Sequence, residues 1–254
     1  MAESAPSAFL TAPFPRVFAH RGFAQEAPEN TLLAFVKALA GGATHLETDV
    51  QVSADGIAVI SHDATLSAVG RDVRIDQLTM NELKRIDLGY GQGYPSLADA
   101  LDAFPSALFN IDIKSDAAAR PTARAIIDAK ATGRVLVTSF NEARRRTAVG
   151  LLPGVQSSAS SSIVAQAMAW TSVSNTTMVR RALRDCIAVQ VPERTGPLRI
   201  VTPRFINMMH RVGVEVHVWT INDPMDMTRL LGLGVDGLIT DRTDSAHNVA
   251  TRRT

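Results

Sequence analysis

Residues 45–63 read HLETDVQVSADGIAVISHD and contain the clearest structural pattern in the chain. Two β-type runs, His45 to Val52 and Ile57 to Ser61, flank a turn at Asp55-Gly56. Glu47 and Asp49 lie two positions apart in the first run, and alternate side chains of a strand point the same way. The stretch therefore predicts a strand with two carboxylates on one face.

The same alternation of β-type and helical patterns extends outward in both directions. A strand is expected at Val17 to His20, followed by a helix with Asn30 as its N-cap and Gly41-Gly42 as its stop. Later strands are expected at Leu108 to Ile113, Val135 to Thr138, Val155 to Ala159, Cys186 to Val191, Val214 to Trp219 and Gly237 to Thr240. Later helices are expected at Ser96 to Phe104, Pro121 to Lys130, after Asn141, Ile163 to Trp170, Pro203 to Val212, Pro224 to Leu231 and Ala246 to Arg252.

This rhythm predicts an α/β fold with about eight strand–helix units, the number that a closed (β/α)8 TIM barrel needs. An open doubly wound sheet is the alternative, which is weaker because no Gly-rich dinucleotide fingerprint follows the first strand. Asp63 to Tyr94 breaks the rhythm and is predicted to be a short insertion between strand two and helix two. Residues 1–254 are expected to form a single barrel domain, in which residues 1–16 are a loose N-terminal tail.

Composition narrows the classes of protein that the chain can represent. Its 254 residues are 46% apolar and 20% charged, which is typical of a globular protein, and the net charge of +1 indicates neither a nucleic-acid nor a membrane partner. The three arginines at 144–146 are expected on a solvated helix face. No apolar run is long enough to span a bilayer, and Cys186 is the single cysteine. We expect a cytoplasmic protein without stable membrane insertion, and make no prediction of an oligomeric state.

Ionisable residues gather where the predicted strands end, which is where barrel enzymes place their chemistry. Glu47, Asp49 and Asp112 offer hard oxygen ligands of the kind that Mg²⁺ or Ca²⁺ prefers. An equally weighted alternative is that these carboxylates pair with Arg21 and Lys114 as salt bridges inside the barrel.

Two histidines stand at strand ends beside the carboxylates. His20 and His62 are candidates for acid–base catalysis, although a single histidine in such a place is more often a hydrogen-bonded structural residue. Arg21 and Lys114 supply positive charge for a phosphate group. A cation site, two bases and two positive side chains together suit phosphoryl transfer. Trp219 either stacks on a substrate or packs in the core.

These residues resemble the pattern of the glycerophosphodiester phosphodiesterase family. The first matching motifs are His20-Arg21-Gly22, Pro28-Glu29-Asn30-Thr31, Glu47-x-Asp49-Val50, Asp55-Gly56 and His62-Asp63. The later ones are Asp112-Ile113-Lys114, Thr138-Ser139-Phe140, Val218-Trp219-Thr220-x-Asn222 and Gly234-Val235-Asp236-Gly237-x-x-Thr240-Asp241. The resemblance covers the chain from about Phe18 to Thr243.

The resemblance implies a (β/α)8 barrel that hydrolyses glycerophosphodiesters to sn-glycerol 3-phosphate and an alcohol. It implies His20 and His62 as general acid and base, and Arg21 and Lys114 as phosphate ligands. It also implies a divalent cation, Mg²⁺ or Ca²⁺, on three acids, and Phe140 and Trp219 as apolar residues framing the alcohol part of the substrate. The three acids are Glu47, Asp49 and Asp112.

One departure from the family pattern bears on the metal. Position 112 is more often Glu in the family, so the shorter Asp112 is expected to reach the metal through water or to shift the metal preference. Two other functions compete with the first. One is a lysophospholipase D-like activity on lipids, which needs an apolar mouth or a membrane-binding helix and ranks lower because the insertion is short and mixed in polarity. The other is a non-catalytic phosphate- or metal-binding barrel, which predicts the loss of at least one site residue.

Overall fold

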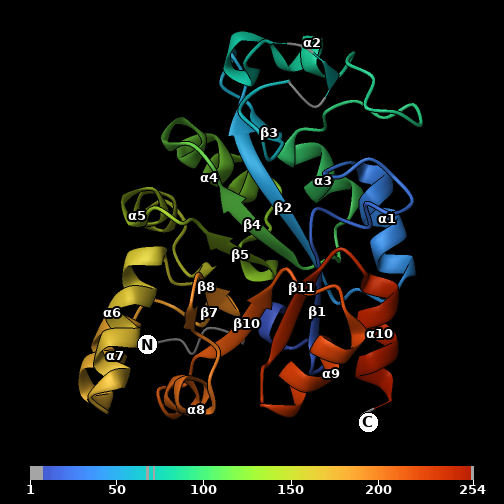
Figure 1. The fold of residues 1–254 in the computed structure, drawn as a ribbon. Coiled ribbons are helices and arrows are strands. Elements are labelled where there is room, and N and C mark those ends of the chain that lie inside the picture. Colours follow the sequence, from blue (N-terminus) through green and yellow to red (C-terminus); the bar gives the residue numbers. More distant parts are fainter. Residues whose placement is uncertain (1–7, 67–68, 71, 253–254) are drawn as a thin grey trace.

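The computed structural model describes residues 8–66, 69–70 and 72–252. Within them, parallel strands follow one another in the order β6-β5-β4-β2-β1-β11-β10-β7 (Figure 1). Their bounds are β1 (Arg16–Ala19), β2 (His45–Val52), β4 (Phe109–Ile113), β5 (Val135–Thr138), β6 (Gln156–Ser157), β7 (Ala188–Pro192), β10 (Glu215–Trp219) and β11 (Gly237–Thr240). A parallel bridge between Ser158 and Ala188 connects β6 to β7 and completes the ring. The predicted (β/α)8 barrel is confirmed.

Helices connect successive strands and cover the outside of the barrel. They are α1 (Leu32–Ala40), α3 (Leu97–Ala103), α4 (Ala119–Asp128), α5 (Glu142–Gly150), α6 (Ser161–Ser172), α7 (Thr176–Ala182), α8 (Pro203–Arg211), α9 (Pro224–Gly232) and α10 (Thr243–Thr251). Side-chain caps begin most of them: Ser96 accepts from the Asp99 amide before α3, and Asn141 accepts from the Arg144 amide before α5. Their apolar faces pack on the strands in two large buried clusters, one for each half of the barrel.

The N-terminal segment corrects one prediction. Residues 1–7 of the expected loose tail lie outside the described part, but Ala8–Leu10 form a short 3-10 helix. Phe9 is fully buried, with its ring centroid 4.5 Å from that of His45 and 6.3 Å from that of Phe18. The tail is not loose here, because this aromatic side chain packs against the first residue of β2.

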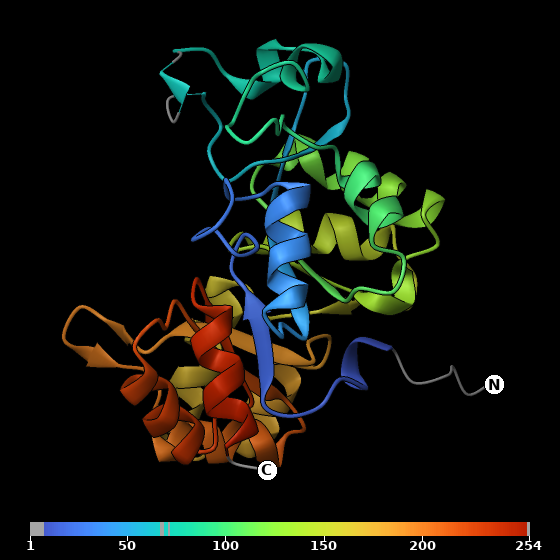
Figure 2. The ribbon, with the colours of Figure 1, turned by 90° about the vertical axis from the view of Figure 1, so that its right-hand side faces the viewer.

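The insertion follows β3 (Ala58–Ile60), which pairs antiparallel with β2. It contains a 3-10 turn, Ile75–Gln77, and α2 (Met80–Leu83), where a helical stretch was predicted. A separate apolar cluster holds it together, with Leu66, Ile75, Met80, Leu83, Ile86 and Tyr94 as members. In both ribbon views the insertion stands at one end of the molecule, beyond β3 (Figures 1 and 2).

Two further local predictions are wrong, and two elements were not predicted. Thr31, not Asn30, caps α1, since its side chain accepts from the Ala34 amide. Helix α7 and the hairpin of β8 (Arg194–Thr195) and β9 (Leu198–Arg199) were not predicted. Arg145 is only 3% exposed and pairs with Glu142, so the arginine run is not entirely solvated.

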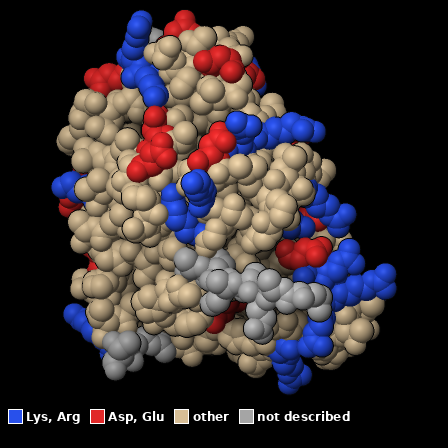
Figure 3. Space-filling view, turned by 180° about the vertical axis from the view of Figure 1, so that it is seen from behind, with Lys and Arg blue, Asp and Glu red and all other residues tan. Residues whose placement is uncertain are grey.

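The surface agrees with the nearly balanced charge of the sequence. On the face opposite to that of Figure 1, Lys and Arg side chains are mixed with Asp and Glu over the upper half (Figure 3). In the described residues, no helix has the length and apolarity needed to cross a bilayer.

Candidate active site

One pocket of about 640 Å³ contains every site residue that the sequence predicted. It opens where β1, β2 and β4 end, so residues distant in sequence line the same wall. The predicted members are His20, Arg21, Glu47, Asp49, His62, Asp112, Lys114, Phe140 and Trp219. The convergence that the strand ends predicted is therefore observed.

His20 follows the last residue of β1 and is held from the neighbouring strand. Its Nδ1 lies 2.7 Å from Oδ1 of Asp241, which follows β11. Asp241 also accepts a 2.8 Å hydrogen bond from Asn222 Nδ2. Burial lowers the pKa of His20, but the hydrogen bond to Asp241 and the charge of Glu47 outweigh burial, so this pKa lies above its ordinary value. With Nδ1 engaged, Nε2 is the nitrogen left for the pocket.

A tight turn after His20 brings the Arg21 backbone to Glu47. Arg21 has φ 55° and Gly22 has φ 82°, and a Cβ on Gly22 would lie 2.7 Å from Cβ of Ala34. The Arg21 amide donates to Glu47 Oε2 at 2.9 Å. Its guanidinium donates to Glu29 at 3.0 Å, and its Nε forms a 3.2 Å ion pair with Asp49. Backbone and side chain thus bind three carboxylates.

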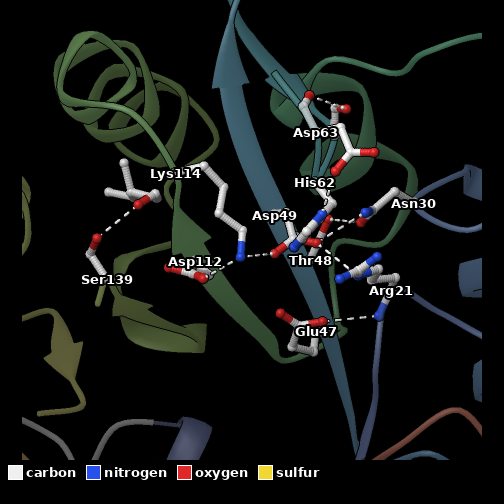
Figure 4. A network of polar contacts seen from close by, with 12 residues as sticks. Arg21, Asn30, Glu47, Thr48, Asp49, His62, Asp63, Asp112, Lys114 and Ser139 are labelled. Carbon is white, nitrogen blue, oxygen red and sulfur yellow. Dashed lines mark hydrogen bonds and ion pairs between the residues drawn. The ribbon is translucent and has the colours of Figure 1, made fainter. Parts of the chain in front are cut away.

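Lys114 lies between two of the predicted metal ligands. Its Nζ is 2.8 Å from Asp49 Oδ1 and 2.6 Å from Asp112 Oδ2 (Figure 4). Asn30 donates to the other oxygen of Asp49 at 3.2 Å and accepts from Thr48 at 2.8 Å. Asp49 and Asp112 are therefore paired in salt bridges, as the alternative prediction had it. A metal would bind through carboxylate oxygens that these contacts do not use.

The charges of the cluster do not balance. Three buried carboxyl groups face two cationic side chains, Arg21 and Lys114. Burial, and then the charge of Asp49, raise the pKa of Glu47 to about 8. Burial also raises the pKa of Asp112, whereas Lys114 and Arg21 overcome burial at Asp49 and hold its pKa below the ordinary value. One acid is left without a matching positive charge.

The carboxylate oxygens that do not take part in these salt bridges suit a hard cation. Asp112 Oδ1 is buried and has no hydrogen-bond partner among the described residues. Glu47 is the carboxyl without a counter-charge, and a cation beside it favours its ionised form. Carboxylate oxygens are the ligands that Mg²⁺ and Ca²⁺ take. Across residues 8–66, 69–70 and 72–252, however, no three His, Cys, Asp or Glu side chains are arranged as a ready-made metal cluster, which agrees with Lys114 lying between two of the acids.

The remaining predicted residues complete the pocket from other strands. His62 lies beyond β3, with Nδ1 2.8 Å from Oδ1 of its neighbour Asp63. Phe140 and Trp219 meet edge to face, with centroids 5.8 Å apart, and Lys114 Nζ lies 5.7 Å from the Phe140 centroid. The aromatic pair therefore lines the pocket beside the charged cluster. Trp219 packs against Phe140, and its stacking on a substrate stays a prediction.

Sequence reasoning missed three polar residues that position the others: Asn30, Asn222 and Asp241. A signal for Asp241 was present, because a closed barrel makes its first and last strands neighbours. Ala19 of β1 pairs with Thr240 of β11, so the residues that follow them must lie side by side. Asn30 was marked by the Pro28-Glu29-Asn30-Thr31 motif but was interpreted only as a helix cap; its backbone has φ 58°.

A parallel barrel that brings imidazoles, acids and two cations together at one mouth has the architecture of a phosphodiester hydrolase. Residues 20–245 match the model of the Glycerophosphoryl diester phosphodiesterase family, and the chain belongs to that family. "Probable glycerophosphodiester phosphodiesterase 2" of Mycobacterium tuberculosis is 39% identical over 240 residues, which cover 92% of this chain and 90% of that protein.

Solved structures share the fold. The glycerophosphodiester phosphodiesterase of Thermotoga maritima is 28% identical with a TM-score of 0.70, and the match covers 90% of this chain and 95% of that one. A phosphodiesterase of Oleispira antarctica, solved in complex with the product sn-glycerol-3-phosphate, is 24% identical with a TM-score of 0.75, covering 93% and 96% of the two chains.

Proposed function

We propose that this enzyme hydrolyses glycerophosphodiesters to sn-glycerol 3-phosphate and an alcohol, with His20 and His62 as its acid–base pair. The observation that carries the proposal is the single pocket in which both imidazoles, three acids and two cations meet. The product bound to the Oleispira antarctica phosphodiesterase, which has the same fold, agrees with it. A non-catalytic barrel predicts a missing site residue, and none of the predicted set is missing.

Glu47, Asp49 and Asp112 would hold a divalent cation, Mg²⁺ or Ca²⁺, through carboxylate oxygens. When bound, the cation supplies positive charge that a phosphodiester and its transition state need. The buried Asp112 Oδ1, which has no partner in the described part of the chain, supports this assignment despite the shorter side chain at that position.

Arg21 and Lys114 bind the anionic ester. Both are already positioned by acids, so each can turn donors toward a phosphate without ordering a free side chain. Arg21 offers a planar fork of N–H groups, while Lys114 acts as a point charge. Phe140 and Trp219 cover the carbon atoms of the alcohol part, because their rings form the adjacent wall.

The two imidazoles move the protons. As the nucleophile, water or the neighbouring glycerol hydroxyl, bonds to phosphorus, one imidazole accepts its proton. The phosphorus–oxygen bond to the alcohol then breaks, and the other imidazole gives a proton to the departing oxygen. When the glycerol hydroxyl is the nucleophile, this step yields a cyclic phosphate, which water opens in a second step to sn-glycerol 3-phosphate. We propose His20 as the proton donor, because its raised pKa favours the protonated form, and His62 as the acceptor. Each such group typically contributes about 10²–10⁴-fold in rate.

Turnover of glycerophosphocholine tests the proposal. We expect choline release that stops on addition of chelator and returns with Mg²⁺, Ca²⁺ or Mn²⁺. His20→Ala and His62→Ala should each lose at least about 100-fold in kcat while retaining the circular dichroism of the parent. If both variants keep the parental rate, these histidines are not the acid–base pair. A cytoplasmic location is part of the proposal, supported by the single cysteine.

A further inference from the structure

Two buried oxygens on β4, Asn110 Oδ1 and Asp112 Oδ1, have no hydrogen-bond partner within the described chain. The two residues are 2% and 5% exposed, and both line the pocket. Because they stand two positions apart on one strand, their side chains lie on the same face of it. An unpaired acceptor in a buried position is costly, so each of these oxygens is expected to meet a ligand.

A chain of hydrogen bonds across the barrel determines which atom of the Asn110 amide is the unpaired one. At the far end of this chain, Arg16 donates to both oxygens of Glu215, at 2.7 Å each. The same carboxylate lies 2.9 Å from His217 Nε2, so in the neutral imidazole Nε2 donates to it, and Nδ1 accepts from Gln190 Nε2 at 3.4 Å. Gln190 Oε1 is then the acceptor for Asn110 Nδ2, at 3.3 Å, and Asn110 Oδ1 is left without a donor.

The neighbours of Asn110 on the pocket face are acids. Asn110 is the cross-strand partner of Glu47, which forms no salt bridge anywhere in the described chain and accepts only the Arg21 amide through Oε2. Asp112 Oδ1 follows on the same face of β4. A substrate hydroxyl has one proton and can satisfy one of these oxygens, whereas a divalent cation can bind several. The group of acceptors therefore favours a cation over a hydroxyl.

Asp49, the remaining acid of the predicted metal set, has cationic or amide partners on both oxygens. Its Oδ1 lies 2.8 Å from Lys114 Nζ, and its Oδ2 lies 3.2 Å from Arg21 Nε and from Asn30 Nδ2 (Figure 4). Asp112 gives one oxygen to Lys114 as well, and it is one methylene shorter than the Glu more often found there in the family. A cation at this site therefore has few carboxylate oxygens to itself, and an amide oxygen adds a ligand without adding charge.

We propose that Asn110 is a further ligand of the divalent cation, which it binds through Oδ1 together with Glu47 and Asp112. This inference rests on the cation assignment of the proposed function. It also gives a role to the hydrogen-bond chain inside the barrel, because Gln190 and His217 hold the amide with its oxygen, and not its nitrogen, toward the acids.

Binding of Mn²⁺ alone, followed by the electron paramagnetic resonance of the free ion, tests this ligand without turnover. Asn110→Leu removes the oxygen at nearly constant volume, and Gln190 Oε1 keeps Ser158 as a donor at 3.4 Å. A polar contact with a charged group is worth roughly 10–100-fold in a binding constant, so we expect the Kd for Mn²⁺ to rise at least about tenfold. Asn110→Asp keeps an oxygen on the same carbon and adds a negative charge, so its Kd should fall below that of the parent.

Thr138→Val is the matched control. Thr138 is a buried pocket residue on β5, and its hydroxyl already accepts from Ser158 at 2.7 Å, so this variant should keep the parental Kd. Urea unfolding of the metal-free variants checks the fold. A merely structural Asn110 would lower the metal-free stability of Asn110→Leu and leave its Kd unchanged.

Three results would contradict the proposal. A parental Kd in Asn110→Leu, or a Kd in Asn110→Asp that does not fall, overturns the role of Asn110 while leaving the cation in place. The second variant carries the test if Leu at this position prevents folding. A parent that binds no Mn²⁺ overturns the cation assignment of the proposed function, and the role of Asn110 with it.

Discussion

Asp241→Asn tests the hydrogen bond that connects the first and last strands of the barrel. In the parent, the Asp241 carboxylate lies 2.7 Å from His20 Nδ1, and the two side chains are 30% and 23% exposed. Hydrogen bonds to charged groups contribute about 1.5–3 kcal/mol, and this partial exposure places the bond near 1.5 kcal/mol. Since one pKa unit corresponds to about 1.4 kcal/mol, the variant should lower the pKa of His20 by about one unit.

The Asp241→Asn substitution should shift the pH profile of the enzyme in a definite direction. The parental His20 keeps its proton to a higher pH than an ordinary histidine, because Asp241 and Glu47 favour the imidazolium. If protonated His20 is the donor to the leaving alcohol, losing the carboxylate moves the basic limb of the pH profile about one unit toward acid. We also expect kcat at pH 7.5 to fall about tenfold, with little change in KM, because Asp241 is a positioning residue and does not line the pocket.

The assay combines the kcat/KM profile from pH 5 to 9.5 with an NMR titration of the His20 imidazole. Asp244→Asn serves as the matched control, because Asp244 pairs with Arg242 nearby and is not a pocket residue. An unchanged His20 titration and an unchanged basic limb in Asp241→Asn would refute the positioning role. An acidic limb that moves instead would show that His20 accepts the proton rather than donating it.

Three other substitutions test the stability of the fold, and the first of them also tests substrate binding. Lys114→Met leaves two buried carboxylates without their shared counter-charge, so we expect a loss of about 3 kcal/mol in urea unfolding and a rise in KM that exceeds the fall in kcat. Gly22→Ala places a Cβ 2.7 Å from Cβ of Ala34 at φ 82°, and unfolding should show a cost of about 2–4 kcal/mol. Burial lowers the pKa of His45 to about 3, so the unfolded chain binds a proton there between pH 6.5 and 3 that the folded chain refuses, and stability falls as pH drops through this window. His45→Gln should remove up to about 1.4 kcal/mol per pH unit from that slope, and urea unfolding between pH 4.5 and 6.5 that gives parallel slopes for parent and variant would contradict this account.

The barrel could be predicted from the sequence because most of its strands are buried on both faces and appear as short apolar runs, such as β5 and β11, while β2 was marked by its β-type run before the Asp55-Gly56 turn. β2, β5 and β11 begin and end at the predicted residues. Helices and strands that bury few apolar side chains showed no such pattern in the sequence. Helix α7 has Val179 as its one buried residue within the described chain, and both strands of the β8–β9 hairpin are exposed. Tertiary contacts, rather than local pattern, determine these elements.

Site residues could be predicted wherever the end of a strand determined the position of a side chain. The prediction was less successful where two adjacent residues could each serve as the helix cap. Asn30 and Thr31 are both good N-caps, and the hydrogen bonds of Asn30 to Thr48 and Asp49 of β2 separate them. Asn30 is drawn into a left-handed conformation to meet Thr48 and Asp49, which leaves Thr31 to cap the helix. Sequence spacing alone also could not show whether Asp49 and Asp112 bind a metal or form salt bridges, because Lys114 contacts both of them.

The pairing of β1 with β11 has a consequence for biosynthesis. His20 is among the first side chains to leave the ribosome, whereas its carboxylate partner, Asp241, follows the last strand of the ring. A nascent polypeptide can therefore contain every residue that lines the pocket and still lack Asp241, the hydrogen-bond partner of the His20 imidazole. Catalytic competence should arrive only when translation has passed β11 and the ring has closed, so partly made chains should not yet hydrolyse phosphodiesters.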